Sequence, residues 1–140
     1  MRFSGPFGVI GAGSWGTTLA QLLADKGYPV DLWVYEEDLC DIIRSTRENR
    51  YYLPGFLLHD NVSVHHDLGN VVKDHSLLVM VVPSHVYRRV AADMVPHLAP
   101  GTVVVSAAKG IENETLLTMS GIWKEIAPRD GLVKVLSLSG

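Results

Sequence analysis

The 140-residue chain has almost no cysteine, no long hydrophobic run and no excess of charge of either sign. Its single cysteine, Cys40, excludes an internal disulfide and any cysteine-rich metal site. Twelve Lys and Arg residues against fifteen Asp and Glu residues give a net charge of −3, which lacks the basic excess typical of nucleic-acid binding. The longest apolar run, residues 77–82, is far shorter than the roughly 20 residues of a membrane span.

The composition is that of a globular domain. Hydrophobic residues make up 47% and charged residues 19% of the chain, which excludes a disordered segment. A chain of this length buries about 68% of the surface exposed on unfolding, so it needs no disulfide or metal to form a core. Residues 1–6 lack the apolar segment of a signal peptide, and we therefore expect a cytoplasmic domain.

Short apolar runs alternate with segments of helical periodicity along the whole chain. Strand followed by helix, repeated, predicts βαβ units and an α/β domain of the Rossmann type: a doubly wound, mostly parallel sheet with helices on both faces. Ligands of this fold bind at the carboxyl ends of the strands. Strands are expected at 7–10, 30–35, 62–64, 77–82, 102–106 and 132–138, helices at 15–26, 37–48, 84–95 and 115–126, a short helix capped by Asp67, and a turn at 51–55.

The first strand is followed by the glycine-rich element Gly11-Ala12-Gly13-Ser14-Trp15-Gly16, which opens a helix. In this GxGxxG context Gly11 allows a tight turn, Gly13 lets a pyrophosphate approach the backbone, and Gly16 lets helix and strand pack closely. The helix N-terminus then offers free amides and a partial positive charge to the phosphates. A structural turn that binds no ligand is the alternative interpretation.

Acidic residues follow the second strand. Glu36 is placed to accept hydrogen bonds from the adenosine ribose, with Tyr35 flanking the adenine, whereas Asp31 lies at the wrong end of the strand. Glu36 and Glu37 would repel a 2′-phosphate, which favours NAD over NADP. Acidic side chains at the exposed start of a helix also interact favourably with the helix dipole. This structural interpretation stays open for Glu36 and is preferred for Glu37.

Nearby arginines bear on the same choice of nucleotide. Arg44, Arg47 and Arg50 are spaced three apart and are the nearby cations that would favour NADP. A solvated helix face is the preferred interpretation of this stripe.

Two further strand ends carry candidates. Ser84 is expected to cap the helix that follows residues 77–82, and its neighbour His85 is either an acid–base group or an exposed loop histidine. Lys109 either places a cation at the mouth of the site or is an ordinary surface lysine. Elsewhere, no metal site is expected, because His75 and the other scattered histidines lack carboxylate or cysteine partners at ligand spacing.

Six motifs in order resemble the NAD(P)-dependent glycerol-3-phosphate dehydrogenase family. They are IGAGSWG at 10–16, LWVYEED at 32–38, YLPG at 52–55, VVPS at 81–84, KGIE at 109–112 and LSG at 138–140. The resemblance implies that Ser14 and Trp15 contact the cofactor at the glycine turn and that Tyr35 meets its adenosine end. It also implies that Val86 lies near the cofactor. Lys109 would touch cofactor and substrate, and Gly140 would begin the loop that binds the substrate phosphate.

The resemblance also implies an enzyme larger than this chain. Family members join a nucleotide-binding domain to a helical substrate domain whose lysine is the general base. They interconvert sn-glycerol 3-phosphate and dihydroxyacetone phosphate with NAD or NADP for glycerophospholipid synthesis. We therefore expect residues 1–140 to be an NAD-binding domain without a catalytic residue of its own. The full chain would form a homodimer that acts on this small-molecule substrate, with NAD preferred.

Three rival functions share parts of this pattern. A dehydrogenase of a hydroxy acid or of 6-phosphogluconate would have the glycine turn but not KGIE and LSG. A non-catalytic nucleotide sensor would have no use for Lys109. A methyltransferase would bind S-adenosylmethionine rather than NADH.

Overall fold

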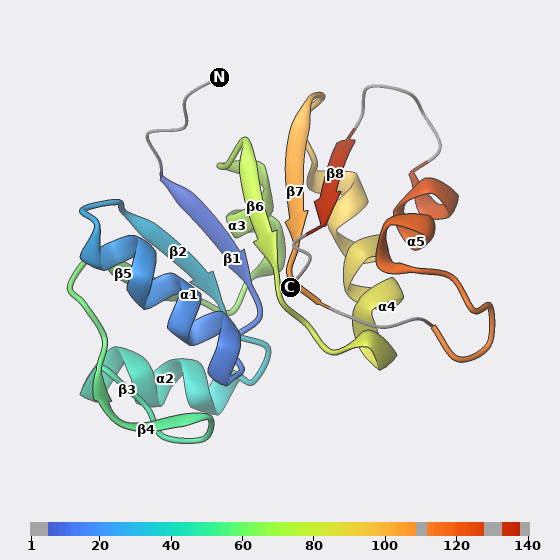
Figure 1. Ribbon diagram of the computed structural model, residues 1–140. Coiled ribbons are helices and arrows are strands. Elements are labelled where there is room, and N and C mark those ends of the chain that lie inside the picture. Colours follow the sequence, from blue (N-terminus) through green and yellow to red (C-terminus); the bar gives the residue numbers. More distant parts are fainter. Residues whose placement is uncertain (1–5, 109–111, 128–132, 138–140) are drawn as a thin grey trace.

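The computed structural model describes residues 6–108, 112–127 and 133–137. In this part of the chain, six parallel strands form one sheet in the order β5-β2-β1-β6-β7-β8 (Figure 1). The predicted doubly wound α/β fold of the Rossmann type is confirmed. The strands are β1 (Phe7–Ile10), β2 (Val30–Trp33), β5 (Val62–His65), β6 (Leu77–Met80), β7 (Thr102–Ser106) and β8 (Val133–Ser137).

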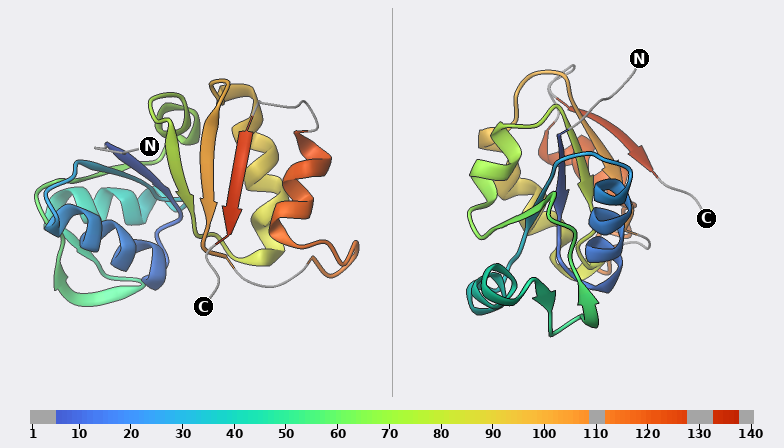
Figure 2. Two further views of the ribbon diagram at one scale, coloured as in Figure 1. Left: turned by 45° about the horizontal axis from the view of Figure 1, so that its top comes forward. Right: turned by 90° about the vertical axis from the view of Figure 1, so that its left-hand side faces the viewer.

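Helices cover both faces of this sheet. They are α1 (Ser14–Asp25), α2 (Glu37–Thr46), α3 (Leu68–Lys73), α4 (Ser84–Met94) and α5 (Met119–Ile126). Successive strand residues point to opposite faces, so Val9 of β1 is buried in the core beneath α1 and α2, and Ile10 in the core beneath α3, α4 and α5. Figure 2 shows α1 and α4 on opposite sides of the sheet. No helix in the described ranges has the length and hydropathy of a membrane span.

The strand order reverses between β1 and β6. The chain first adds β2 and β5 on one side of β1, then returns to place β6 on the other side and continues outward to β7 and β8. Both α1 and α4 begin at the carboxyl edge of the sheet, next to this reversal (Figure 1). A crevice at such a reversal is where doubly wound sheets bind their ligands.

Several element ends differ from the sequence prediction. The strands predicted at 30–35 and 77–82 end at Trp33 and Met80. The helix predicted at 37–48 ends at Thr46, because Arg47 takes the left-handed conformation with φ 62°. Its guanidinium donates to the carbonyl oxygens of His59 and Val62, at 2.7 Å each, which holds this helix end against the start of β5.

Two predicted helix starts in the second half were also inexact. Ser84 is not a cap: α4 begins at Ser84 itself after Pro83, without a side-chain cap hydrogen bond. The helix predicted at 115–126 begins at Met119, where Thr118 Oγ1 accepts a hydrogen bond from the Gly121 amide at 3.2 Å. The predicted cap at Asp67 is confirmed, since its carboxylate accepts from the Asn70 amide at 3.1 Å.

The turn predicted at 51–55 is part of a small antiparallel hairpin. Its strands are β3 (Glu48–Asn49) and β4 (Leu53–Leu57), and Asn49 pairs with Leu53. Pro54 and Gly55 lie inside β4, and residues of these types are depleted in strands. The hairpin follows α2 and lies near the carboxyl edge of the main sheet (Figure 1).

Candidate nucleotide-binding site

A cavity of about 690 Å³ lies at the carboxyl edge of the sheet. It is lined by the turn after β1, the end of β2, the segment from β6 into α4, and residues that follow β7. Lys109 and Gly140 fall outside the described residues. The structure brings together at this cavity the other predicted site residues: Gly11, Gly13, Ser14, Trp15, Gly16, Tyr35, Glu36 and Val86.

The three glycines of the turn occupy different environments. Gly11 has φ +118°, and a Cβ there would lie 2.7 Å from the Val81 carbonyl oxygen. A Cβ at Gly16 would lie 2.0 Å from the Gly11 carbonyl oxygen, so α1 can approach β1 this closely only without a side chain. A Cβ at Gly13 would meet no protein atom within 4 Å. The space in front of Gly13 is therefore open to a ligand.

The start of α1 provides hydrogen-bond donors to that space. The amide of Thr17 donates to Gly13 O at 3.0 Å, whereas those of Ser14, Trp15 and Gly16 have no acceptor within the described part of the chain. Gly13 is the N-cap and cannot offer a side-chain acceptor. Unpaired amides and the positive end of the helix dipole suit an anion such as a pyrophosphate.

The end of β2 adds an aromatic ring and a carboxylate. Tyr35 is 60% exposed and packs edge-on against Trp33, with ring centroids 6.0 Å apart. Glu36 is the N-cap residue of α2, yet its side chain makes no cap hydrogen bond. Its Oε2 instead accepts a hydrogen bond from the hydroxyl of Tyr52, and this bond raises the pKa of Tyr52. The carboxylate therefore faces the cavity rather than closing the helix.

The three arginines considered as a 2′-phosphate site lie elsewhere. Arg44 donates to the Val64 carbonyl at 3.1 Å, and Arg47 is bound to carbonyls of the segment that leads into β5. Arg50 lies 3.8 Å from Glu48. None of the three lines the cavity. Arg44 and Arg50 are exposed, in agreement with a solvated face, whereas Arg47 is half-buried.

The opposite wall of the cavity comes from the start of α4. Ser84, His85 and Val86 line it, His85 being exposed, and Arg89 adds a positive charge that the sequence interpretation missed. Behind this wall the guanidinium of Arg88 binds both oxygens of Glu112, with Nε to Oε2 at 2.8 Å. These hydrogen bonds lower the pKa of Glu112.

Asn49 is a further residue that the sequence interpretation missed. Its fully buried amide donates to the Ala12 carbonyl at 2.8 Å and to Thr17 Oγ1 at 2.9 Å. Its Oδ1 accepts from the amide of Tyr52 at 3.1 Å. One side chain thus joins the glycine turn, α1 and the hairpin. Asparagine in a polar, turn-like segment gives no local sign of such a role.

Comparison with known proteins agrees with this geometry. The sequence profile described as "NAD-dependent glycerol-3-phosphate dehydrogenase N-terminus" matches residues 6–140. The chain belongs to this family. The resemblance based on the ordered motifs is therefore confirmed. Membership in this family favours the glycerol-3-phosphate dehydrogenase assignment over the rival dehydrogenases, the nucleotide sensor and the methyltransferase.

Individual members of the glycerol-3-phosphate dehydrogenase family are similar over nearly the whole chain. The protein named glycerol-3-phosphate dehydrogenase (NAD(P)+) of Syntrophobacter fumaroxidans is 63% identical over 140 residues, which are 100% of this chain and 41% of that protein. The protein of the same name from Syntrophotalea carbinolica is 50% identical over 133 residues, 95% of this chain and 40% of that protein. The chain therefore spans about two fifths of these relatives.

A solved structure supports the same assignment. The crystal structure of glycerol-3-phosphate dehydrogenase from Coxiella burnetii superposes with a TM-score of 0.86 at 32% sequence identity. The match covers 96% of this chain and 40% of that one.

Proposed function

We propose that this chain is the nucleotide-binding domain of a glycerol-3-phosphate dehydrogenase, with NAD or NADP as cofactor. The observation that carries the proposal is the open position at Gly13, next to the amides of Ser14, Trp15 and Gly16, which have no acceptor among the described residues. A pyrophosphate fits there, because no side chain blocks its approach to the main chain. The relatives' names, which include NAD(P)+, support the same cofactor class.

The proposed site residues have distinct roles. The turn from Gly11 to Gly16 holds the diphosphate, Glu36 accepts the ribose hydroxyls, and Tyr35 flanks the adenine. Val86 borders the nicotinamide side, where Lys109 would orient substrate oxygens and Gly140 would begin the phosphate-binding loop. The bound nicotinamide supplies the redox chemistry, and the protein's part is placement.

The substrate pair follows from the family. sn-Glycerol 3-phosphate and dihydroxyacetone phosphate would be interconverted, feeding glycerophospholipid synthesis. The general base would be a lysine of a helical substrate domain in the longer protein, so residues 1–140 alone should bind nucleotide with little or no turnover. A homodimer and a cytoplasmic location stay predictions for the full-length protein.

NADH should bind more tightly than NADPH, because the Glu36 and Glu37 carboxylates repel a 2′-phosphate. Calorimetric titration of the 140-residue chain with each nucleotide tests this, with an expected preference of about tenfold. Dihydroxyacetone-phosphate-dependent oxidation of NADH by the full-length protein tests the reaction. Binding of neither nucleotide would refute the assignment, and tighter binding of NADPH would refute the role given to Glu36.

A further inference from the structure

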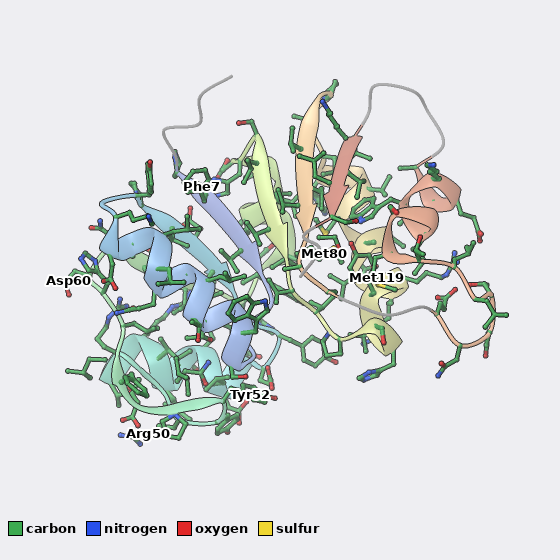
Figure 3. All side chains as sticks on the ribbon, in the orientation of Figure 1. Phe7, Arg50, Tyr52, Asp60, Met80 and Met119 are labelled. Atoms are coloured by element: carbon green, nitrogen blue, oxygen red, sulfur yellow. The ribbon has the colours of Figure 1, made fainter. Side chains whose placement is uncertain are left out.

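The hairpin delivers a side chain to the end of β2 from a distant part of the sequence. Tyr52 lies in the turn between β3 and β4, immediately before β4, and it lines the cavity with Tyr35 and Glu36. In Figure 3 it lies below the start of α1. Its hydroxyl donates to Glu36 Oε2 across a sequence separation of 16 residues. The hairpin and the end of β2 therefore meet where we expect the ribose of a nucleotide to bind.

The position of Tyr52 is fixed by a buried contact. Its main-chain amide donates to Asn49 Oδ1, and the Asn49 amide group is itself anchored to Ala12 O and Thr17 Oγ1. Asn49 is fully buried, so these bonds are shielded from competing water. The backbone of Tyr52 is thereby set relative to the same glycine turn that would hold the diphosphate.

The carboxylate of Glu36 depends on this neighbour for its orientation. It does not cap α2, and within the described residues Tyr52 is its only hydrogen-bond partner. A glutamate has several freely rotating bonds, and without a partner its carboxylate would swing into solvent. Tyr52 occupies one oxygen and leaves the other to accept from a ligand, since an ionised carboxylate has several acceptor sites.

We propose that Tyr52 is a specificity-determining residue: it holds the Glu36 carboxylate in the orientation that accepts the adenosine ribose hydroxyls of NADH, and so strengthens the preference for NADH over NADPH. This inference rests on the proposed nucleotide-binding function. A restrained carboxylate favours a diol that donates hydrogen bonds and opposes a 2′-phosphate, whereas a free one can turn away from that phosphate.

The adjacent tyrosine provides a matched control. The hydroxyl of Tyr51 donates to Asp38 in the same way, but neither residue lines the cavity. Tyr51 and Tyr52 are similarly exposed, at 48% and 43%, and their rings pack edge-on with centroids 6.2 Å apart. Tyr51→Phe and Tyr52→Phe each remove one hydroxyl from the same hairpin, and only the second should alter nucleotide preference.

The test is calorimetric titration of the 140-residue chain with NADH and with NADPH, in wild type, Tyr51→Phe, Tyr52→Phe, Glu36→Ala and the Tyr52→Phe/Glu36→Ala double variant. Tyr52→Phe should weaken NADH binding about tenfold and NADPH binding much less, and Tyr51→Phe should leave the ratio unchanged. In the Glu36→Ala background Tyr52→Phe should change NADH affinity by less than about twofold, because the hydroxyl acts through Glu36.

Three outcomes overturn the inference: unchanged affinities for both nucleotides in Tyr52→Phe, an equal loss for both nucleotides, or a full effect that persists without the Glu36 carboxylate. An equal loss or a persisting effect would mean that Tyr52 contacts the nucleotide directly or supports the hairpin. If the wild-type protein prefers NADH and Tyr52→Phe has the same nucleotide affinities as wild type, this inference alone is refuted. Wild-type protein that binds neither nucleotide refutes the proposed function as well.

Discussion

Replacing Gly13 with valine should abolish NADH binding without unfolding the protein. A Cβ at Gly13 meets no protein atom within 4 Å, so the new side chain occupies only the space assigned to the diphosphate. Gly13 has φ −68° and ψ −175°, an extended conformation that valine adopts without strain. The change therefore separates ligand binding from folding.

The magnitudes follow from the same geometry. Restricting the unfolded chain at Gly13 adds about 0.4–1 kcal/mol to the free energy of unfolding, and loss of a glycine N-cap removes roughly as much. Stability should thus change by less than about 1 kcal/mol. The dissociation constant of NADH should rise at least about 100-fold, or roughly 2.8 kcal/mol, because the diphosphate can no longer reach the amides of α1.

Gly16→Ala is the matched comparison. Its Cβ would lie 2.0 Å from the Gly11 carbonyl oxygen, so α1 must move away from β1. Overpacking of this kind costs about 1–3 kcal/mol, which lowers the melting temperature by roughly 5–10 °C.

Calorimetric titration and thermal unfolding of the two variants measure both effects. Wild-type NADH affinity in Gly13→Val would refute the placement of the diphosphate. Wild-type stability in Gly16→Ala would refute the close packing of turn and helix.

Two further predictions concern stability. Asn49→Ala should cost about 2–4 kcal/mol and lower the melting temperature by roughly 10 °C, because buried polar groups of Ala12 and Thr17 lose their partner; an unshifted melt would contradict this. Hydrogen bonds from Arg88 lower the pKa of Glu112. Their contribution to the stability of the folded state is therefore complete above the ordinary glutamate pKa of about 4.3, and it is lost as the pH falls through the lowered pKa. Scanning calorimetry from pH 6 to 3 should therefore show a steeper loss of stability in wild type than in Arg88→Met, and equal slopes would exclude this contribution.

The strands and helices and the glycine turn were predictable because the sequence patterns that indicate them are local. The alternation of apolar strands with helical periodicity places every strand of the main sheet to within a few residues. The glycine turn is recognisable because Gly11 and Gly16 meet steric demands of the strand-to-helix transition itself, whereas Gly13 leaves the space in front of it open. At the end of α2, where the prediction erred, a distant contact had shifted the local preference. Arg47 ends α2 early because its guanidinium is bound to carbonyls of His59 and Val62.

The partners of polar side chains were not predictable in this way. The sequence places Asp31 at the wrong end of its strand for a ribose contact and gives His75 no carboxylate partner at ligand spacing. In the structure Asp31 is contacted by His75 Nε2 at 2.9 Å and by His65 Nε2 at 2.7 Å. His75 lies 44 residues from Asp31 in sequence, and only the pairing of β1 with β2 and β6 brings the two together.

The sequence by itself determined the class of fold and the location of the glycine turn that we propose holds a diphosphate, since both depend on spacings of a few residues. Tertiary structure alone decided which groups surround that turn: Tyr52 against Glu36, Asn49 beneath the glycine turn, and Arg44 and Arg47 turned away toward β5. A hydrogen bond between side chains requires their atoms to meet within about 3 Å. Such proximity arises from the docking of the hairpin and from strand register, which no local pattern of residues encodes.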